Sequence, residues 1–187
     1  MKQLTVLIIL FGINQLFAQS SWNIDPSHSS ITFSVGYLGI SDVTGSFKKY
    51  DGNIKTTSTD FSDAKISFTV DVSSIDTDID ARDNHLKSPD FFDAAKFSKM
   101  SFESTAFKKK GKNKFLLEGN LSIKGTSKKV SFEVTSGGTA KDNYGNERVG
   151  MTLFGKVKRS DYQINGGQGF VGDEVSFALN FNFIKSK

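Results

Sequence analysis

The sequence contains no cysteine, and this absence excludes several kinds of protein. No disulfide can hold the fold together, so the chain must rely on an apolar core and on backbone hydrogen bonds. Thiolate metal sites and cysteine nucleophiles are excluded. The lack of a cysteine also argues against a lipoprotein anchor.

Long apolar runs are scarce as well. The run over residues 4–13 covers about ten positions, which is too few to span a bilayer. Lys2 precedes this run and the small residue Ala18 follows it, a pattern typical of a secretory signal peptide. We therefore expect a cleaved signal peptide over residues 1–18 and a mature chain that begins near Gln19. The mature protein would be exported, to the periplasm or outside the cell, without stable membrane insertion.

Motifs for catalysis and for metal binding are poorly represented. The two histidines, His28 and His85, lie far apart, and neither belongs to an H-x-x-x-H pair. There is no G-x-S-x-G nucleophile turn. We expect no catalytic residue, no metal ion and no cofactor.

A calcium loop is indicated only in part. Residues 76–80 read D-x-D-x-D, which is how an EF-hand loop opens. The sixth position should be glycine and is Ala81, and the twelfth should be glutamate and is Lys87. The aspartates are therefore better explained as polar residues that cap and solvate this segment.

Basic residues slightly outnumber acidic ones, giving a net charge of +4. The largest basic run, KKKGKNK at residues 108–114, lacks the interleaved aromatic residues that single-strand nucleic-acid binders use. We interpret it as a solvated hairpin tip and expect no nucleic-acid partner.

Apolar and polar residues alternate with a period of two along most of the chain, which predicts strands with one buried face. Such strands are typical of antiparallel sheets. About eight of them, joined by short turns, predict an all-β sandwich or up-and-down barrel in a single domain over residues 19–187. The predicted strands cover residues 31–37, 47–54, 64–72, 99–104, 115–123, 130–134, 149–157 and 175–183.

The alternation stops between residues 74 and 93, where we predict a short helical insertion near residues 78–95. A helix over 78–87 would pair Asp78 with Arg82, four residues apart. Ser88, followed by Pro89, predicts the start of a second helical turn. The insertion would form a lid over one end of the barrel.

Phenylalanine is abundant: there are 18, against one tryptophan and four tyrosines. An eight-stranded barrel is just wide enough to be filled by its side chains or to hold one small ligand. Composition alone favours a packed core over a lined cavity. If a cavity exists, an apolar lining would suit an apolar guest, because polar groups would lose their hydration inside.

Several motifs, in this order and spacing, resemble the YceI-like family of exported lipid-binding proteins. The likeness runs from about Trp22 to Phe183. It rests on Trp22 to Pro26 with His28-Ser29, Val43 to Phe47 with Gly52, Ser74 to Thr77, Arg82 to Leu86, Asp90 to Asp93, Gly119 to Val130, Arg159 to Tyr162 and Gly172 to Val175.

The resemblance implies an eight-stranded, antiparallel, lipocalin-like barrel, and it shifts the balance from a packed core to a lined tunnel. The expected guest is a long-chain isoprenoid lipid, such as a polyprenyl phosphate or an isoprenoid quinone, which the protein would carry or store. Arg82 and His85 would lie near the mouth and contact the head group. The tail would lie against Phe33, Val35, Phe68, Val70, Phe91, Phe92, Phe102, Phe132, Leu153, Phe177, Leu179 and Phe181.

Two other functions stay open. The first is an enzyme on a similar apolar substrate, with His85, Arg82 and Asp83 as its acidic and basic groups. The second is a secreted stress or interaction module whose barrel is packed throughout. A homodimer is among the open alternatives for the assembly.

Overall fold

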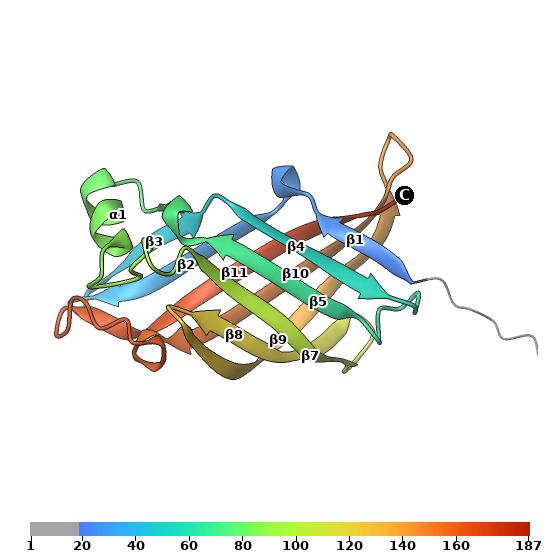
Figure 1. Cartoon of the computed structure of the whole chain (residues 1–187). Coiled ribbons are helices and arrows are strands. Elements are labelled where there is room, and N and C mark those ends of the chain that lie inside the picture. Colours follow the sequence, from blue (N-terminus) through green and yellow to red (C-terminus); the bar gives the residue numbers. More distant parts are fainter. Residues whose placement is uncertain (1–18) are drawn as a thin grey trace, which may run out of the picture.

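The structure, a computed structural model, describes residues 19–187, so the predicted signal peptide lies outside the described residues. Strands dominate the chain, with one short α-helix and three 3-10 turns (Figure 1). The elements are β1 (Ser20–Ile24), η1 (Pro26–His28), β2 (Ser30–Tyr37), β3 (Ser41–Phe47), β4 (Tyr50–Thr56), β5 (Lys65–Asp71), η2 (Val72–Ser74), β6 (Ile75–Asp76), α1 (Asp80–Lys87), β7 (Lys99–Lys109), β8 (Lys114–Ile123), β9 (Thr126–Lys141), β10 (Glu147–Lys158), η3 (Arg159–Tyr162) and β11 (Val171–Lys185).

The eleven strand segments form a closed antiparallel barrel of eight strands. Eleven segments make eight barrel strands because three pairs of segments each form one strand with a short interruption. The pairs are β1 with β2, β3 with β4, and β5 with β6. β11 closes the barrel by pairing with β10 on one side and with both β1 and β2 on the other. The predicted all-β antiparallel barrel is confirmed, and the sandwich alternative is not what forms.

The three interruptions lie side by side in the barrel wall. Pro26 has no N–H to donate to a ladder, and it begins η1, which separates β1 from β2. In the next strand the N–H of Lys48 donates to the carbonyl of Ser74 in η2, at 3.1 Å. The Tyr50 hydroxyl donates to the Ser29 carbonyl at 2.6 Å. The wall therefore bends at one level without leaving these backbone groups unpaired.

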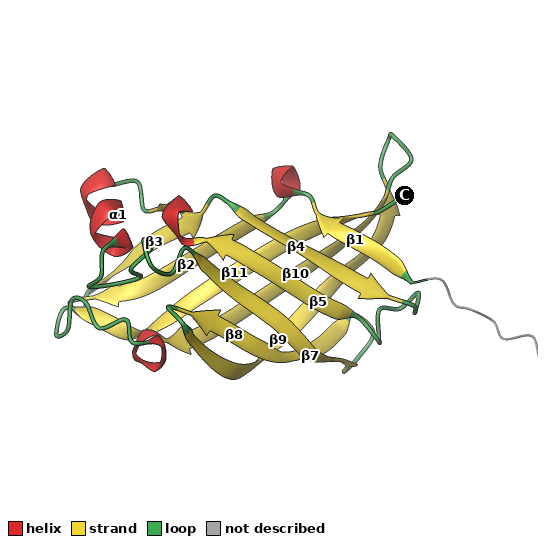
Figure 2. Cartoon of the chain, viewed as in Figure 1, coloured by secondary structure: helices red, strands yellow, loops and turns green. Residues whose placement is uncertain are grey.

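The two ends of the barrel differ in construction. One end carries α1, the β2–β3 turn, the β8–β9 turn and the loop between β10 and β11, and we call it the covered end (Figure 2). The opposite end, which we call the far end, carries the C-terminus, the β7–β8 hairpin and the β9–β10 hairpin (Figure 1). No helix in the described part of the chain is long and apolar enough to cross a bilayer.

The insertion differs in detail from its prediction. The helix begins at Asp80, because Asp78 has a left-handed backbone with φ of 62°. A second helix does not follow: residues 88–96 form turns. Ser88 ends α1 instead of capping a new helix, and its hydroxyl is buried without a hydrogen-bond partner. Two strands that the sequence did not predict complete the wall: β1, and β3 up to its last residue, Phe47.

A charged network ties the start of the chain to β10 and β11. The Arg148 guanidinium donates to Asp25 at 2.7 Å and to Asp142 at 2.8 Å, with all three side chains largely buried. The hydrogen bond from Arg148 is the main reason that the pKa of Asp25 falls to about 2, and a bond with His28 lowers it further against the effect of burial. The same guanidinium holds the pKa of Asp142 well below its usual range.

This network predicts a pH-dependent stability. A carboxylate with a lowered folded pKa stabilises the fold fully above its unfolded pKa of about 3.9 and loses that effect as the pH falls through the folded pKa. For Asp25 the loss therefore spans about pH 4 to about pH 2. Arg148→Gln is expected to lower the free energy of unfolding at pH 7, because it removes the charged hydrogen bonds to Asp25 and Asp142. Urea denaturation as a function of pH should show this deficit shrinking in the same window.

A suitable control is Lys156→Gln. Lys156 pairs with Glu174 at 2.6 Å, but both side chains are more than half exposed. Exposed ion pairs contribute little, so this change should stay below about 0.5 kcal/mol at any pH. A deficit for Arg148→Gln that is equal at pH 7 and pH 2 would contradict the assignment.

Candidate functional site

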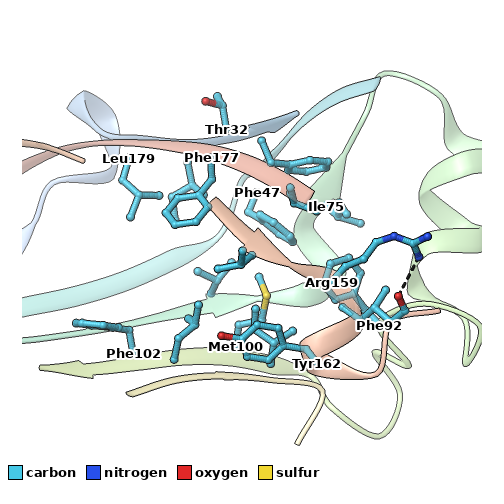
Figure 3. Close-up of a pocket in the computed structure, with 18 of the residues that line it drawn as sticks. Thr32, Phe47, Ile75, Phe92, Met100, Phe102, Arg159, Tyr162, Phe177 and Leu179 are labelled. Carbon is cyan, nitrogen blue, oxygen red and sulfur yellow. Dashed lines mark hydrogen bonds between the residues drawn. The ribbon is translucent and has the colours of Figure 1, made fainter. Parts of the chain in front are cut away.

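An apolar cavity of about 170 Å³ lies inside the barrel towards the covered end. Its accessible wall consists of apolar atoms alone. Below it, towards the far end, the barrel is filled by buried side chains that include Trp22, Phe107 and Phe115. The molecule thus has a packed half and a hollow half, and Figure 3 shows side chains from several strands converging on the hollow half.

Glycines in the wall make room for the aromatic rings. Phe33 lies opposite Gly45 on the neighbouring strand, and Phe177 lies opposite Gly155. A Cβ added at Gly155 would come within 2.5 Å of the Phe177 ring and within 2.9 Å of the Phe132 ring. Each of these rings therefore occupies the space over a glycine instead of projecting across the bore, which leaves the centre open.

The cover of the cavity consists of two segments that hold each other. The first is the insertion over residues 77–98, and the second is the loop over residues 159–170. Phe91 of the insertion is buried against Gly166 of the loop, whose N–H donates to the Asp90 carbonyl at 3.0 Å. Lys124, in the β8–β9 turn, donates to a carbonyl of each segment, at 3.0 and 3.2 Å.

A polar clamp anchors the insertion. The buried carboxylate of Asp83 accepts hydrogen bonds from the N–H and the hydroxyl of Thr77, at 2.9 and 2.6 Å. Arg82 donates to the hydroxyl and the carbonyl of the same threonine, at 2.7 and 2.6 Å. Arg82 therefore bonds to Thr77 instead of forming the predicted ion pair with Asp78. The bonds of Asp83 and Arg82 to Thr77 therefore hold α1 in place.

Arg159 performs the corresponding role in the loop. Only 8% of this residue is exposed, and its guanidinium donates to four backbone carbonyls between residues 164 and 172, at 2.6 to 3.0 Å. Its aliphatic part lines the cavity, while the guanidinium turns towards the loop, where a dashed line marks one of these bonds (Figure 3). The cationic group is thereby kept away from the apolar interior.

Tyr162 adds a further polar residue to the wall without adding charge. Burial raises its pKa to about 12, so the phenol stays protonated at neutral pH. The wall therefore offers an uncharged surface to whatever enters it.

Most of the residues expected to contact a lipid tail lie in the cavity wall, on strands or in the insertion. Those in the wall are Phe33, Val35, Phe68, Val70, Phe91, Phe92, Phe102, Phe132, Leu153, Phe177 and Leu179.

Three expected residues lie elsewhere. Phe181 lies below the cavity, because it is two residues further along β11 towards the far end than Leu179. Its ring centroid is about 6 Å from those of Tyr50 and Phe68. His85 is on the outer surface, with its side chain 60% exposed and its Nε2 3.2 Å from Asp90. Arg82 is held in the clamp outside the cavity wall.

Other wall residues were not expected from the sequence to contact a ligand. They are Ile31, Thr32, Phe47, Ile75, Leu86, Met100, Leu117, Leu121, Ile123, Val157, Arg159, Tyr162, Ile164, Val171 and Val175. For Arg159 a signal existed, because the period of two that contains Leu153 and Val157 reaches it on the same face.

Together, the fold and the cavity define the class of protein: a closed eight-stranded barrel that encloses an apolar cavity. A family profile described as the YceI-like domain matches residues 22–183. Protein YceI of Salmonella arizonae is 31% identical over 185 residues, covering 98% of this chain and 96% of that protein. Its counterpart in Salmonella paratyphi B shows the same identity and coverage. The chain belongs to the YceI-like family.

Solved structures agree with this placement. The YceI protein of Campylobacter jejuni is 30% identical, with a TM-score of 0.71 over 79% of this chain and 88% of that one. BcnA of Burkholderia cenocepacia has a TM-score of 0.75 at 24% identity, covering 85% and 98%. A polyisoprenoid binding domain from Saccharophagus degradans has a TM-score of 0.70 at 14% identity, covering 88% and 98%. The last two show the shared fold.

The packing of Gly155 predicts an asymmetry between two glycines of β10. Gly155→Ala would push its neighbouring rings into the bore, and such overpacking lowers the free energy of unfolding by about 1–3 kcal/mol. A Cβ at Gly150 meets nothing within 4 Å, so Gly150→Ala should be neutral or slightly stabilising. Urea denaturation of the two variants measures the difference. Equal effects of the two substitutions on the free energy of unfolding would show that the packing of the rings does not depend on Gly155.

Proposed function

We propose that this protein binds the hydrocarbon chain of an amphiphilic isoprenoid lipid inside the covered half of its barrel, as a carrier or a store. The observation that carries the proposal is the cavity itself, whose accessible wall is apolar throughout. Burying apolar surface there would contribute about 25 cal/mol per Å². A polar guest would lose its hydration and gain no hydrogen bonds in return.

The similar barrel from Saccharophagus degradans supports the choice of ligand class, since it is described as a polyisoprenoid binding domain. A branched, flexible chain also suits a wall built from rings and branched aliphatic side chains. Polyprenyl phosphates and isoprenoid quinones share such a chain and differ in the head group. The proposal rests on the hydrocarbon chain of the lipid and not on its head group.

The cavity holds only part of a long chain as it stands, because about 170 Å³ is less than the 300–1,000 Å³ of a typical ligand pocket. Further space would come from side chains that are only partly buried, such as Phe33 and Phe92. The cover must also move for a chain to enter. We place the head group at the covered end, where Arg82 and His85 would be within its reach once the cover has moved.

Two consecutive residues of β10 give a direct test. Leu153 faces the cavity, whereas Phe154 is 69% exposed on the outer wall. Leu153→Trp should fill the cavity and weaken binding of geranylgeraniol by about tenfold or more, because less apolar surface of the ligand can be buried. Phe154→Trp should leave binding unchanged. Co-elution of radiolabelled geranylgeraniol on gel filtration, with circular dichroism to verify folding, provides the measurement.

Mass spectrometry of organic extracts from natively purified protein identifies the lipid. A protein that yields no lipid and takes up no added prenol would refute the proposal. His85→Ala tests the enzymatic alternative, in which the bound prenol would be converted by wild type and not by the variant. The exposed position of His85, which is not among the residues that line the cavity, favours unaltered prenol instead.

We also propose that the protein is exported. The basic start, the short apolar run over residues 4–13 and the small residue Ala18 support this. N-terminal sequencing of protein recovered from the periplasm or the medium should then begin at Gln19. Recovery of the full chain from the cytoplasm alone would contradict it.

A further inference from the structure

Exposed apolar side chains gather at the covered end of the barrel. Among the described residues, the large hydrophobic side chains that are exposed are Tyr37, Leu38, Ile40, Ile79, Tyr144, Phe154 and Phe170. Four of them lie in two neighbouring turns, Tyr37 to Ile40 and Phe170, which we call the apolar tip. Scattered single exposed hydrophobic residues are ordinary, but a cluster on one protrusion indicates a contact surface.

The two turns of the apolar tip are joined to each other. The N–H of Leu38 donates to the Phe170 carbonyl at 2.7 Å, and Tyr37 pairs with Val171 in the ladder between β2 and β11. Ile40 and Phe170 are 84% and 60% exposed. The tip is therefore a fixed protrusion of the barrel wall, on the end opposite the C-terminus (Figure 1).

The backbone of the β2–β3 turn shows that its apolar residues are not incidental. Leu38 and Gly39 have φ of 53° and 71°, the left-handed pair of a tight hairpin turn. Asparagine or glycine fits the first of these positions without strain and would be well hydrated. A leucine with a positive φ is strained and also exposes its side chain to water. Such an outlier points to a function that needs the side chain.

Charge is absent from both turns, although the chain carries 24 basic and 20 acidic residues. Residues 29–41 and 162–172 contain no Asp, Glu, Lys or Arg. A surface that binds anionic lipid or a charged protein partner would carry complementary charge. An uncharged apolar protrusion instead fits the interface of a bilayer, where apolar side chains are buried at the level of the head groups.

The tip continues directly into the cavity wall. Val35 lies two residues before Tyr37, Val171 follows Phe170, and both valines line the cavity. We propose that the apolar tip docks the barrel on the surface of an uncharged or zwitterionic lipid bilayer, with the covered end facing the membrane. In this orientation a lipid chain passes between bilayer and cavity without crossing water. Docking stands by itself, and only the passage of lipid rests on the proposed function.

Vesicle flotation tests the docking. Wild type should float with phosphatidylcholine vesicles, and the triple variant Leu38→Ser, Ile40→Ser, Phe170→Ser should partition at least about tenfold more weakly, because three apolar side chains no longer enter the interface. The matched controls are Tyr144→Ser and Phe154→Ser, which remove exposed rings at the far end and on the outer wall. All variants are compared in chains of the same length, so any contribution of the apolar run over residues 4–13 to vesicle binding is the same in each.

A second measurement locates the contact. Because the chain has no cysteine, Ile40→Cys and Tyr144→Cys each give a single site for an environment-sensitive nitrobenzoxadiazole label. Adding vesicles should shift the emission to shorter wavelength for the label at position 40 only. Equal shifts at both positions, no flotation of wild type, or equal loss in the controls would overturn the proposal.

A second copy of the chain is the competing occupant of the apolar tip. Sedimentation equilibrium that showed dimers abolished by the triple variant, with no vesicle binding by wild type, would assign the tip to self-association and overturn docking. Uptake of geranylgeraniol from ethanol solution separates docking from ligand binding, since the triple variant should retain it. If wild type floats and takes up no prenol, docking holds and the proposed function fails.

Discussion

The placement of phenylalanine rings over wall glycines is the constraint on which the rest of the structure depends. An eight-stranded barrel has an interior that its own side chains can fill, and this one is rich in the residue that fills space best. Gly45, Gly119 and Gly155 remove the Cβ atoms that would collide with the rings of Phe33, Phe102 and Phe177. The rings can therefore lie against the wall, and a cavity survives in a bore that would otherwise close.

Charge in this barrel is used to hold its segments in place. Asp25, Arg148 and Asp142 secure the start of the chain, Asp83 and Arg82 secure the insertion, and Arg159 secures the loop before β11. None of these groups presents its charge to the cavity, whose accessible wall is apolar. In this structure Asp25, Asp83 and Asp142 are bonded within these networks, and the side chains of His28 and His85 are 65% and 60% exposed.

The period of two predicted most of the wall, because one buried face leaves a strong signal in strands such as β5 and β11. It missed β3, where an inward glycine at Gly45 interrupts the apolar series. The expectation that Arg82 and His85 contact a head group came from the family resemblance and not from the period of two. The contacts that hold Arg82 on Thr77 and leave His85 on the outer surface are not encoded in that local pattern. The helix begins two residues later than predicted, with Asp83 as its buried residue and Leu86 in the cavity wall. The fold followed from local pattern, whereas the clamps depend on contacts between segments that pattern does not encode.

Opening of the hollow half, which the proposed binding of a lipid chain requires, would not dismantle the barrel. Its cover is held by side-chain bonds to carbonyls, through Lys124 and Arg159, and by the packing of Phe91 on Gly166. The wall is held by continuous ladders between long strands. Segments held by a few contacts open at a lower free energy than the core, so the cover can part while the ladders remain. A chain without disulfides thus keeps its stability in the ladders and the packed half, while the cover over the cavity depends on fewer contacts.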